Sequence, residues 1–188
     1  MTLESKLDAL KADFEAGKPP YNVPHLAIEV MHQATAELLA SGLVDKAPAF
    51  TLPDPNCVEV SLVNLLRKSP LVVSFYRRVW FAYWNRGLQA FEAELPQIIA
   101  LGASLVAVSP QTAARSRKST WQNNLTFSVQ NDVNNAVAAT FGVRYEMPPY
   151  LIDLYKPLKN DLPRFNGEGS WSLPLPGRFE IVIDSHCL

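Results

Sequence analysis

Apolar residues recur every three or four positions at the start of the chain, which is the spacing of one side of a helix. A helix is predicted over residues 2–18 by the line Leu3, Leu7, Leu10 and Phe14. A second helix is predicted over residues 22–41 by the line Leu26, Val30, Ala34 and Leu38. Each helix has a side to bury, so residues 1–44 are expected to form a helical extension packed on a main domain.

From residue 49 the pattern changes to alternating strands and helices. Two continuous apolar runs, 71–75 and 105–109, are typical of strands buried on both faces. Between them a helix is predicted over 83–101, kinked at Pro96 and ended by Gly102. The order strand, helix, strand predicts a parallel crossover unit.

Shorter signals surround this unit. Before it we expect a strand at 50–52, a turn at 53–56 and a helix over 62–67 capped by Ser61. After it we expect, in order, a helix over 113–123, a strand at 127–129, a helix over 134–141, a helix over 150–158, a turn-rich loop at 165–171 and a strand at 179–184.

Composition excludes several classes of function. The 188 residues carry 17 Lys and Arg against 18 Asp and Glu, a net charge of −1, and lack the basic face expected of a nucleic-acid partner. No apolar run is long enough to span a bilayer, and the first residues lack the apolar core of a signal peptide. We therefore expect a cytoplasmic protein that binds neither nucleic acid nor membrane.

Metal and redox signals are sparse. His25, His32 and His186 have no recognised metal-ligand spacing, so no metal and no cofactor are expected. The two cysteines, Cys57 and Cys187, are far apart in sequence and form no redox motif. Cys187 follows His186, whose imidazolium could assist a thiolate, whereas Cys57 lies beside a turn with no helix after it.

The segment after the first buried strand carries the strongest signal. It reads Phe75-Tyr76-Arg77-Arg78-Val79-Trp80-Phe81-Ala82-Tyr83-Trp84-Asn85. It resembles the peroxiredoxin-like branch of the alkyl hydroperoxide reductase/thiol-specific antioxidant (AhpC/TSA) family, which reads Phe-Tyr-Arg-Gly-x-Trp-Cys-Pro-Tyr-Cys-Asn. Six positions fit: Phe75, Tyr76, Arg77, Trp80, Tyr83 and Asn85. Four depart: Arg78, Phe81, Ala82 and Trp84.

The resemblance extends to residues 50–53, 95–103, 105–111, 131–132 and 165–171. It implies an α/β fold of the thioredoxin-like, peroxiredoxin type, with a central mixed sheet flanked by helices, over residues 45–188. Relatives continue with a hairpin partner strand and a last helix. A strand at 179–184 without that neighbour would leave an apolar edge, so we expect a homodimer through it or cover from the N-terminal helices.

The resemblance also implies a thiol peroxidase and oxidoreductase, because family members attack peroxide with a cysteine thiolate. Phe81 and Trp84 stand at the two cysteine positions, so no catalytic residue is expected. The retained neighbours are Arg77, Trp80 and Tyr83. A protein or small-ligand partner could bind at Tyr76, Arg77, Trp80, Phe81 and Trp84; core packing of these rings is the alternative interpretation.

Three hypotheses remain open at this point. The first is a non-catalytic relative that acts by binding or as a structural protein. The second is a thiol oxidoreductase that uses Cys187 or Cys57 instead. The third is an altered copy of an active family member, in which the motif changes carry no purpose.

Overall fold

A four-stranded sheet forms the centre of the molecule. The computed structural model describes residues 47–77, 82–156, 162–166, 171–174 and 179–183, together with Ala9 and Ala12, which are both helical. The strand order is β5-β4-β3-β8. β3 pairs in parallel with β4, β4 pairs in parallel with β5, and β8 runs antiparallel to β3. The strands span Leu71–Phe75 (β3), Ser104–Ser109 (β4), Ser128–Asn131 (β5) and Phe179–Ile183 (β8).

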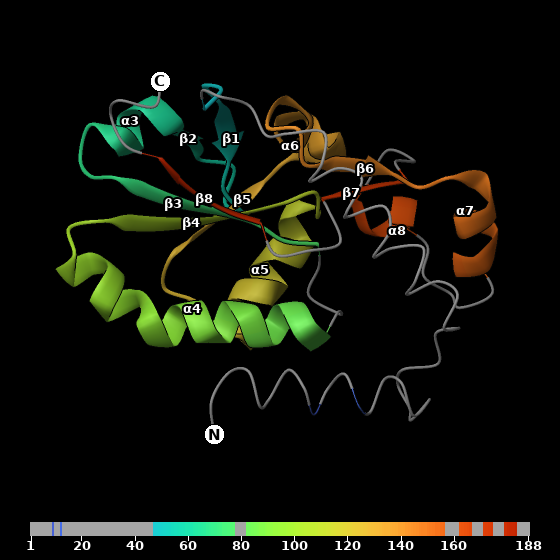
Figure 1. Ribbon diagram of the computed structural model, residues 1–188, viewed down its shortest axis with the longest axis horizontal. Helices are drawn as coiled ribbons and strands as arrows, with labels where there is room; N and C mark the ends of the chain where they lie inside the picture. Colours follow the sequence, from blue (N-terminus) through green and yellow to red (C-terminus); the bar gives the residue numbers. More distant parts are fainter. Residues whose placement is uncertain are drawn as a thin grey trace.

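Helices cover both faces of this sheet, which gives the molecule three layers (Figure 1). On one face lie α4 (Ala82–Ala100) and α5 (Ala113–Gln122). On the other lie α3 (Leu62–Leu66), α6 (Ala136–Thr140) and the antiparallel hairpin of β1 (Thr51–Pro53) and β2 (Glu59–Ser61). β3 and β4 are therefore enclosed from both sides, as their apolar runs require.

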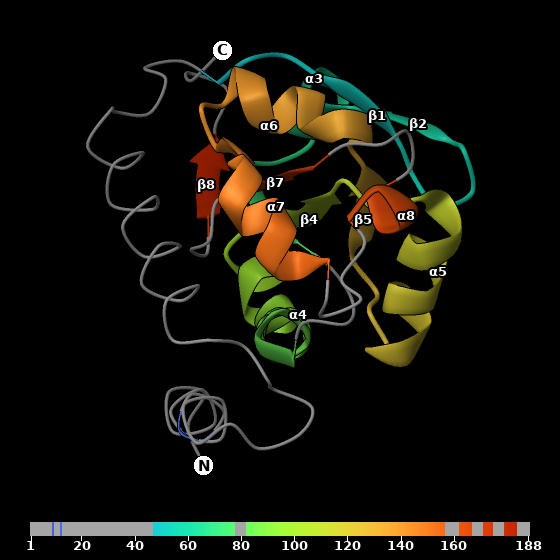
Figure 2. The same cartoon turned by 90° about the vertical axis from the view of Figure 1, so that its right-hand side faces the viewer.

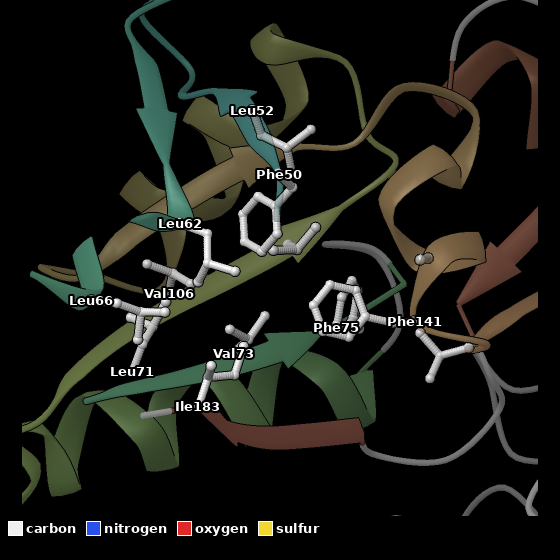
Figure 3. Packing of buried hydrophobic residues seen from close by; sticks show 13 residues of the cluster. Phe50, Leu52, Leu62, Leu66, Leu71, Val73, Phe75, Val106, Phe141 and Ile183 are labelled. Atoms are coloured by element: carbon white, nitrogen blue, oxygen red, sulfur yellow. The ribbon is translucent and has the colours of Figure 1, made fainter. Parts of the chain in front are cut away.

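Alternation along the strands divides the core in two. Side chains facing α4 form one cluster, and its buried members are Tyr76, Leu88, Leu95, Leu105, Ala107, Leu125, Phe127 and Val129. The cluster on the opposite face is larger (Figure 3). There the Phe141 ring centroid lies 5.4 Å from that of Phe75 and 6.0 Å from that of Phe50, which joins α6, β3 and the start of β1.

A third group of short elements lies beyond the carboxyl end of β3 (Figure 1). β6 (Arg144–Glu146) pairs antiparallel with β7 (Ser172–Pro174). The helices of this region are the 3₁₀ turn η1 (Val133–Asn135), α7 (Pro149–Tyr155) and α8 (Leu162–Asn166).

The predicted strand, helix and parallel strand at the centre are confirmed, as are the helix at 113–123 and the last strand. α4 continues through Pro96, and the chain turns after it at Gly102 with a φ of 77°. The expected N-terminal helices lie outside the described residues, apart from Ala9 and Ala12.

Several local predictions are wrong. The helix expected over 134–141 is divided, because Asn134 and Asn135 adopt left-handed φ values of 59° and 53°. The loop expected from residue 165 is wrong at Phe165 and Asn166, which end α8. Ser61 occupies the N-cap position of α3 but makes no capping hydrogen bond with its side chain. The strands β2, β6 and β7 were not predicted.

The aromatic contacts of Phe141 give a first testable prediction. Phe141→Ala is expected to lower the free energy of unfolding by about 3–5 kcal/mol, because the cavity lies between two other rings in a closed core. Chemical denaturation followed by circular dichroism measures the change. Leu101→Ala, at a side chain 85% exposed, is the control and should change stability by no more than about 0.5 kcal/mol. Equal effects of the two substitutions would contradict the assignment of Phe141 to the core.

Candidate functional site

The carboxyl ends of the parallel strands β3, β4 and β5 meet at one side of the sheet, which we call the carboxyl edge. In open α/β sheets this is where ligands bind. It consists of Tyr76 and Arg77 after β3, Ser109 to Gln111 at the end of β4, and Asn131 and Asp132 at the end of β5. α4 begins below the same edge, so the sheet and the helix start converge there (Figure 1).

Tyr76 lies at the centre of a buried group of polar side chains. Its hydroxyl accepts a hydrogen bond of 3.2 Å from Gln111 Nε2. Burial raises the pKa of Tyr76, and the nearby side chains of Ser119, Ser109, Gln111 and Ser116 offset only part of that rise. Tyr76 is therefore a neutral phenol that makes hydrogen bonds at this edge and supplies no charge.

Two serines of α5 face this tyrosine. Ser116 and Ser119 are buried, and both favour the charged form of Tyr76 by their closeness to it. Within the described residues, neither hydroxyl makes a well-formed hydrogen bond. The two serines therefore lie close to the phenol without bonding to it.

Arg77 is enclosed by protein. The residue is only 4% exposed, and its Nε donates a 3.3 Å hydrogen bond to the carbonyl of Pro174 in β7. Its own carbonyl accepts from Ser109 Oγ at 3.4 Å, and that hydroxyl in turn accepts from the Gln111 amide at 3.4 Å. The segment after β3 and the strand β7 of a second sheet therefore hold this guanidinium inside the protein.

Asn85 ties the first turn of α4 to the end of α5. Its Oδ1 accepts a 3.0 Å hydrogen bond from Asn123 Nδ2, which also donates to the carbonyl of Ser119 at 3.0 Å. Gln89, one turn further along α4, donates to Asn123 Oδ1 at 3.1 Å. These amides fix the start of α4 relative to the end of α5, which is a positioning role.

The structure reaches the aromatic segment only in part. The backbones of Tyr83 and Trp84 belong to the first turn of α4, and their side chains lie outside the described residues. Arg78, Trp80 and Phe81 also lie outside the described residues, as does Cys187. Whether the rings pack together or line an opening stays a prediction.

Cys57 lies in the turn of the hairpin between β1 and β2. It is exposed and has a left-handed φ of 64°. The side chain of Asp54 organises this turn, because its Oδ1 accepts from the amides of Asn56 at 2.8 Å and Val58 at 2.9 Å. Cys57 is thus exposed, whereas Arg77, the one retained charge of the motif, is buried.

Asp132 is a buried carboxylate that belongs to a segment resembling the family, although the sequence assigned no role to it. Its Oδ1 accepts from the amide of Val137 at 2.9 Å and its Oδ2 from that of Ala138 at 2.8 Å, so it holds the start of α6. Burial raises the pKa of Asp132, while the amides of α6 and the charge of Arg144 lower it without cancelling the rise. The useful sequence signal was an aspartate directly before a helical segment.

Three further polar residues join β7 and α8 to this edge. Asn135 Nδ2 donates to Ser172 Oγ at 2.9 Å, and Asn166 Nδ2 donates to the carbonyl of Ser172 at 3.1 Å. All three are buried. They were also missed, because only the folded chain brings them together.

The described part of the edge offers hydrogen bonds, one guanidinium and one buried carboxyl group, and contains no thiol. The described residues contain no group of three or more His, Cys, Asp or Glu side chains that could hold a metal ion. Among the described helices, none has both the length and the apolar character needed to cross a membrane.

Comparisons with known proteins agree with the sequence resemblance. The sequence profile of the AhpC/TSA family matches residues 43–186. The fold is similar to peroxidoxin BcpB from Mycobacterium tuberculosis, with a TM-score of 0.61 and 21% identity over 77% of this chain and 80% of that chain. A comparison with curated protein sequences finds no match.

Two further solved structures share the fold. One is a variant of peroxiredoxin Q from Xanthomonas campestris, with a TM-score of 0.50 and 21% identity over 54% of this chain and 64% of that chain. The other is a variant of PrxQ from Xylella fastidiosa, with a TM-score of 0.50 and 20% identity over the same shares, 54% and 64%. The expected thioredoxin-like, peroxiredoxin-type fold is confirmed.

The raised pKa of Asp132 predicts a dependence of stability on pH. The folded chain holds the proton of Asp132 more tightly than the unfolded chain, so the resulting stabilisation is complete below the ordinary pKa of 3.8. It is lost as the pH rises through the higher pKa of the folded state. The free energy of unfolding of the natural chain, relative to that of Asp132→Asn, should therefore decrease as the pH rises from 3.8 to the higher pKa of the folded state, and then level off.

Urea denaturation at a series of pH values measures this difference. Asp153→Asn is the control, because it removes an exposed carboxyl group from α7. A stability difference that increases with pH over the same interval would contradict the assignment.

Proposed function

We propose, from the premise that the chain belongs to the AhpC/TSA family, that it is a peroxiredoxin-like protein without thiol peroxidase activity. In this proposal it is a non-catalytic member of the family, with a binding or structural role. One observation carries the proposal: Phe81 and Trp84 stand where the resembled pattern has its two cysteines.

The chemistry of the two aromatic residues supports the loss. A peroxidatic cysteine acts as a thiolate, and a helix start and nearby cations lower its pKa. Phenylalanine has neither a nucleophile nor a proton to release. Tryptophan cannot form the disulfide that resolves a sulfenic acid. Both steps of the family's reaction therefore lack their reacting atom.

The surroundings of Arg77 support the same conclusion. A cation that activates a thiol directs its charge at the sulfur. Here Nε of Arg77 donates to the Pro174 carbonyl, and the residue is buried between β3 and β7. This is a structural use of the guanidinium that does not depend on a thiol.

The alternative hypothesis, chemistry at Cys57 or Cys187, gains no support from the described residues. Cys57 is exposed in a hairpin turn, and the helix after β2 begins at Leu62, beyond that hairpin. Cys187 lies outside the described residues. The alternative therefore serves as an outcome of the test below.

The binding surface in this proposal is the aromatic segment that follows β3. Trp80, Phe81 and Trp84 would receive a protein or a small ligand, because aromatic side chains concentrate binding energy. Tyr76 and Arg77, which the sequence also suggested for binding, are buried and offer no surface to a partner. We also propose a homodimer and a cytoplasmic location. β8 lies at one edge of the four-stranded sheet and has β3 as its neighbour, which supports pairing between copies.

A peroxidase assay tests the loss of activity. The purified chain is expected to consume hydrogen peroxide or cumene hydroperoxide no faster than buffer containing dithiothreitol. The matched control is the variant with both Cys57→Ala and Cys187→Ala, which removes the remaining thiols. Faster peroxide turnover by the natural chain than by this variant would contradict the proposed loss of activity and favour chemistry at Cys57 or Cys187.

Restoring the sulfur tests the cause of the loss. We expect the variant with Phe81→Cys and Trp84→Cys to consume peroxide. The thiol at position 81 would lie beside the start of a long helix, so its pKa should fall below the usual value of about 8.5. Iodoacetamide alkylation against pH measures that pKa. An inert variant with an ordinary thiol pKa would show that more than the two cysteines has been lost.

A further inference from the structure

The outer side of α5 carries a stripe of exposed residues that the proposed function does not use. Ala114, Arg117, Lys118 and Trp121 fall at i, i+3, i+4 and i+7, which places them along one side of the helix. All four are exposed, whereas Ser116 and Ser119 on the opposite side are buried. We call these four residues the α5 stripe.

Trp121 is the most unusual member of the α5 stripe. It is 77% exposed, although its side chain is among the largest apolar surfaces a protein can bury. Covering such a ring typically removes roughly 150–250 Å² from water, and tryptophan is enriched among residues that dominate binding energy. Single exposed apolar residues are common on protein surfaces, but Trp121 is large and lies on the same side of the helix as Arg117 and Lys118.

The charge of α5 is of one sign. The helix contains Arg115, Arg117 and Lys118 and no Asp or Glu, in a chain whose acidic and basic residues are nearly equal in number. Among the described residues, no carboxylate forms an ion pair with any of these three cations. A purely solvated helix surface usually mixes both signs, because ion pairs between neighbouring turns stabilise it.

Neighbouring elements hold the basic side chains in place. Nη1 of Arg117 donates to the carbonyl of Pro55 in the β1–β2 hairpin. The guanidinium carbon of Arg115 lies 4.1 Å from the ring centroid of Phe165 in α8. Burial lowers the pKa of Arg115, and the like charge of Arg164 lowers it further, so positive charge is concentrated between α5 and α8.

The stripe is accessible at the periphery of the molecule. Figure 2 shows α5 at the right-hand side of the molecule, below the β1–β2 hairpin and beside α8, with β4 and β5 to its left. Both neighbours agree with the contacts of Arg117 and Arg115. A partner could therefore reach the stripe without moving any described element.

We propose that the α5 stripe is a docking surface for an acidic segment of a partner protein. Trp121 receives an apolar or aromatic side chain of that segment, and Arg117 and Lys118 pair with its carboxylates. Charge complementarity selects this occupant. Few cations and a net charge of −1 do not suit a nucleic-acid backbone, and one ring is too little apolar surface for a bilayer.

Selection from a library of random displayed peptides tests the proposal. The natural chain is the bait, and a variant with Arg117→Glu, Lys118→Glu and Trp121→Ala is used for counter-selection. Enriched peptides should be rich in Asp and Glu and contain an aromatic or leucine residue. Their affinity, measured by fluorescence anisotropy, should fall about tenfold or more with Trp121→Ala and weaken with added salt.

Two matched controls separate the stripe from general surface effects. Arg67→Glu with Lys68→Glu reverses an equivalent exposed pair after α3, and Tyr150→Ala removes another exposed ring, which is 59% exposed. Neither should alter binding. The proposal is overturned if no peptide is enriched, if the enriched peptides are not acidic, or if the controls weaken binding as much as the stripe variants. It is also overturned if a single-stranded oligonucleotide or anionic vesicles bind through the stripe and the peptides do not.

Discussion

The parallel pairing of β3 with β4 is the constraint on which the rest of the structure depends. Both strands are buried on both faces, so their backbone groups must be satisfied by each other and by β5 and β8. This arrangement needs a helical crossover between the strands and cover on each side of the sheet. α4, α5 and the α3, α6 and hairpin layer follow from that need. The carboxyl edge exists because the parallel strands must end together.

The same constraint explains how much of the fold was predictable. β3, β4 and α4 are long or strongly apolar, so patterns within each segment specify them. β2, β6 and β7 have three residues each, and two of them contain charged residues at exposed positions. They become strands because a partner is brought to them, as Arg144 is brought opposite Pro174. Asn134 and Asn135 interrupt a helical pattern through a backbone conformation that asparagine tolerates.

The candidate site was predictable only where resemblance located it. Phe81, Trp84 and Arg77 were singled out by their positions in the motif, and of these three the structure describes the side chain of Arg77 alone. Gln111 lies in a segment that resembles the family, but the sequence assigned no role to it or to Ser172, since their roles depend on contacts with Tyr76 and Asn135 that only the folded chain creates. Local sequence therefore indicated the segment in which the family's chemistry is expected. Long-range hydrogen bonds determined which polar residues come together at the carboxyl edge.

Loss of a reactive thiol need not disturb this fold, because the carboxyl edge is maintained by groups that do not involve sulfur. Gln111 donates a hydrogen bond to the hydroxyl of Tyr76, and the guanidinium of Arg77 donates one to the carbonyl of Pro174 in β7. Asp132 meanwhile holds the start of α6 through two backbone amides. Leaving buried polar groups such as these without partners costs free energy, so the network is retained for stability whether or not catalysis continues. The described part of the edge would therefore keep these hydrogen bonds in a family member that lacks the reactive thiols.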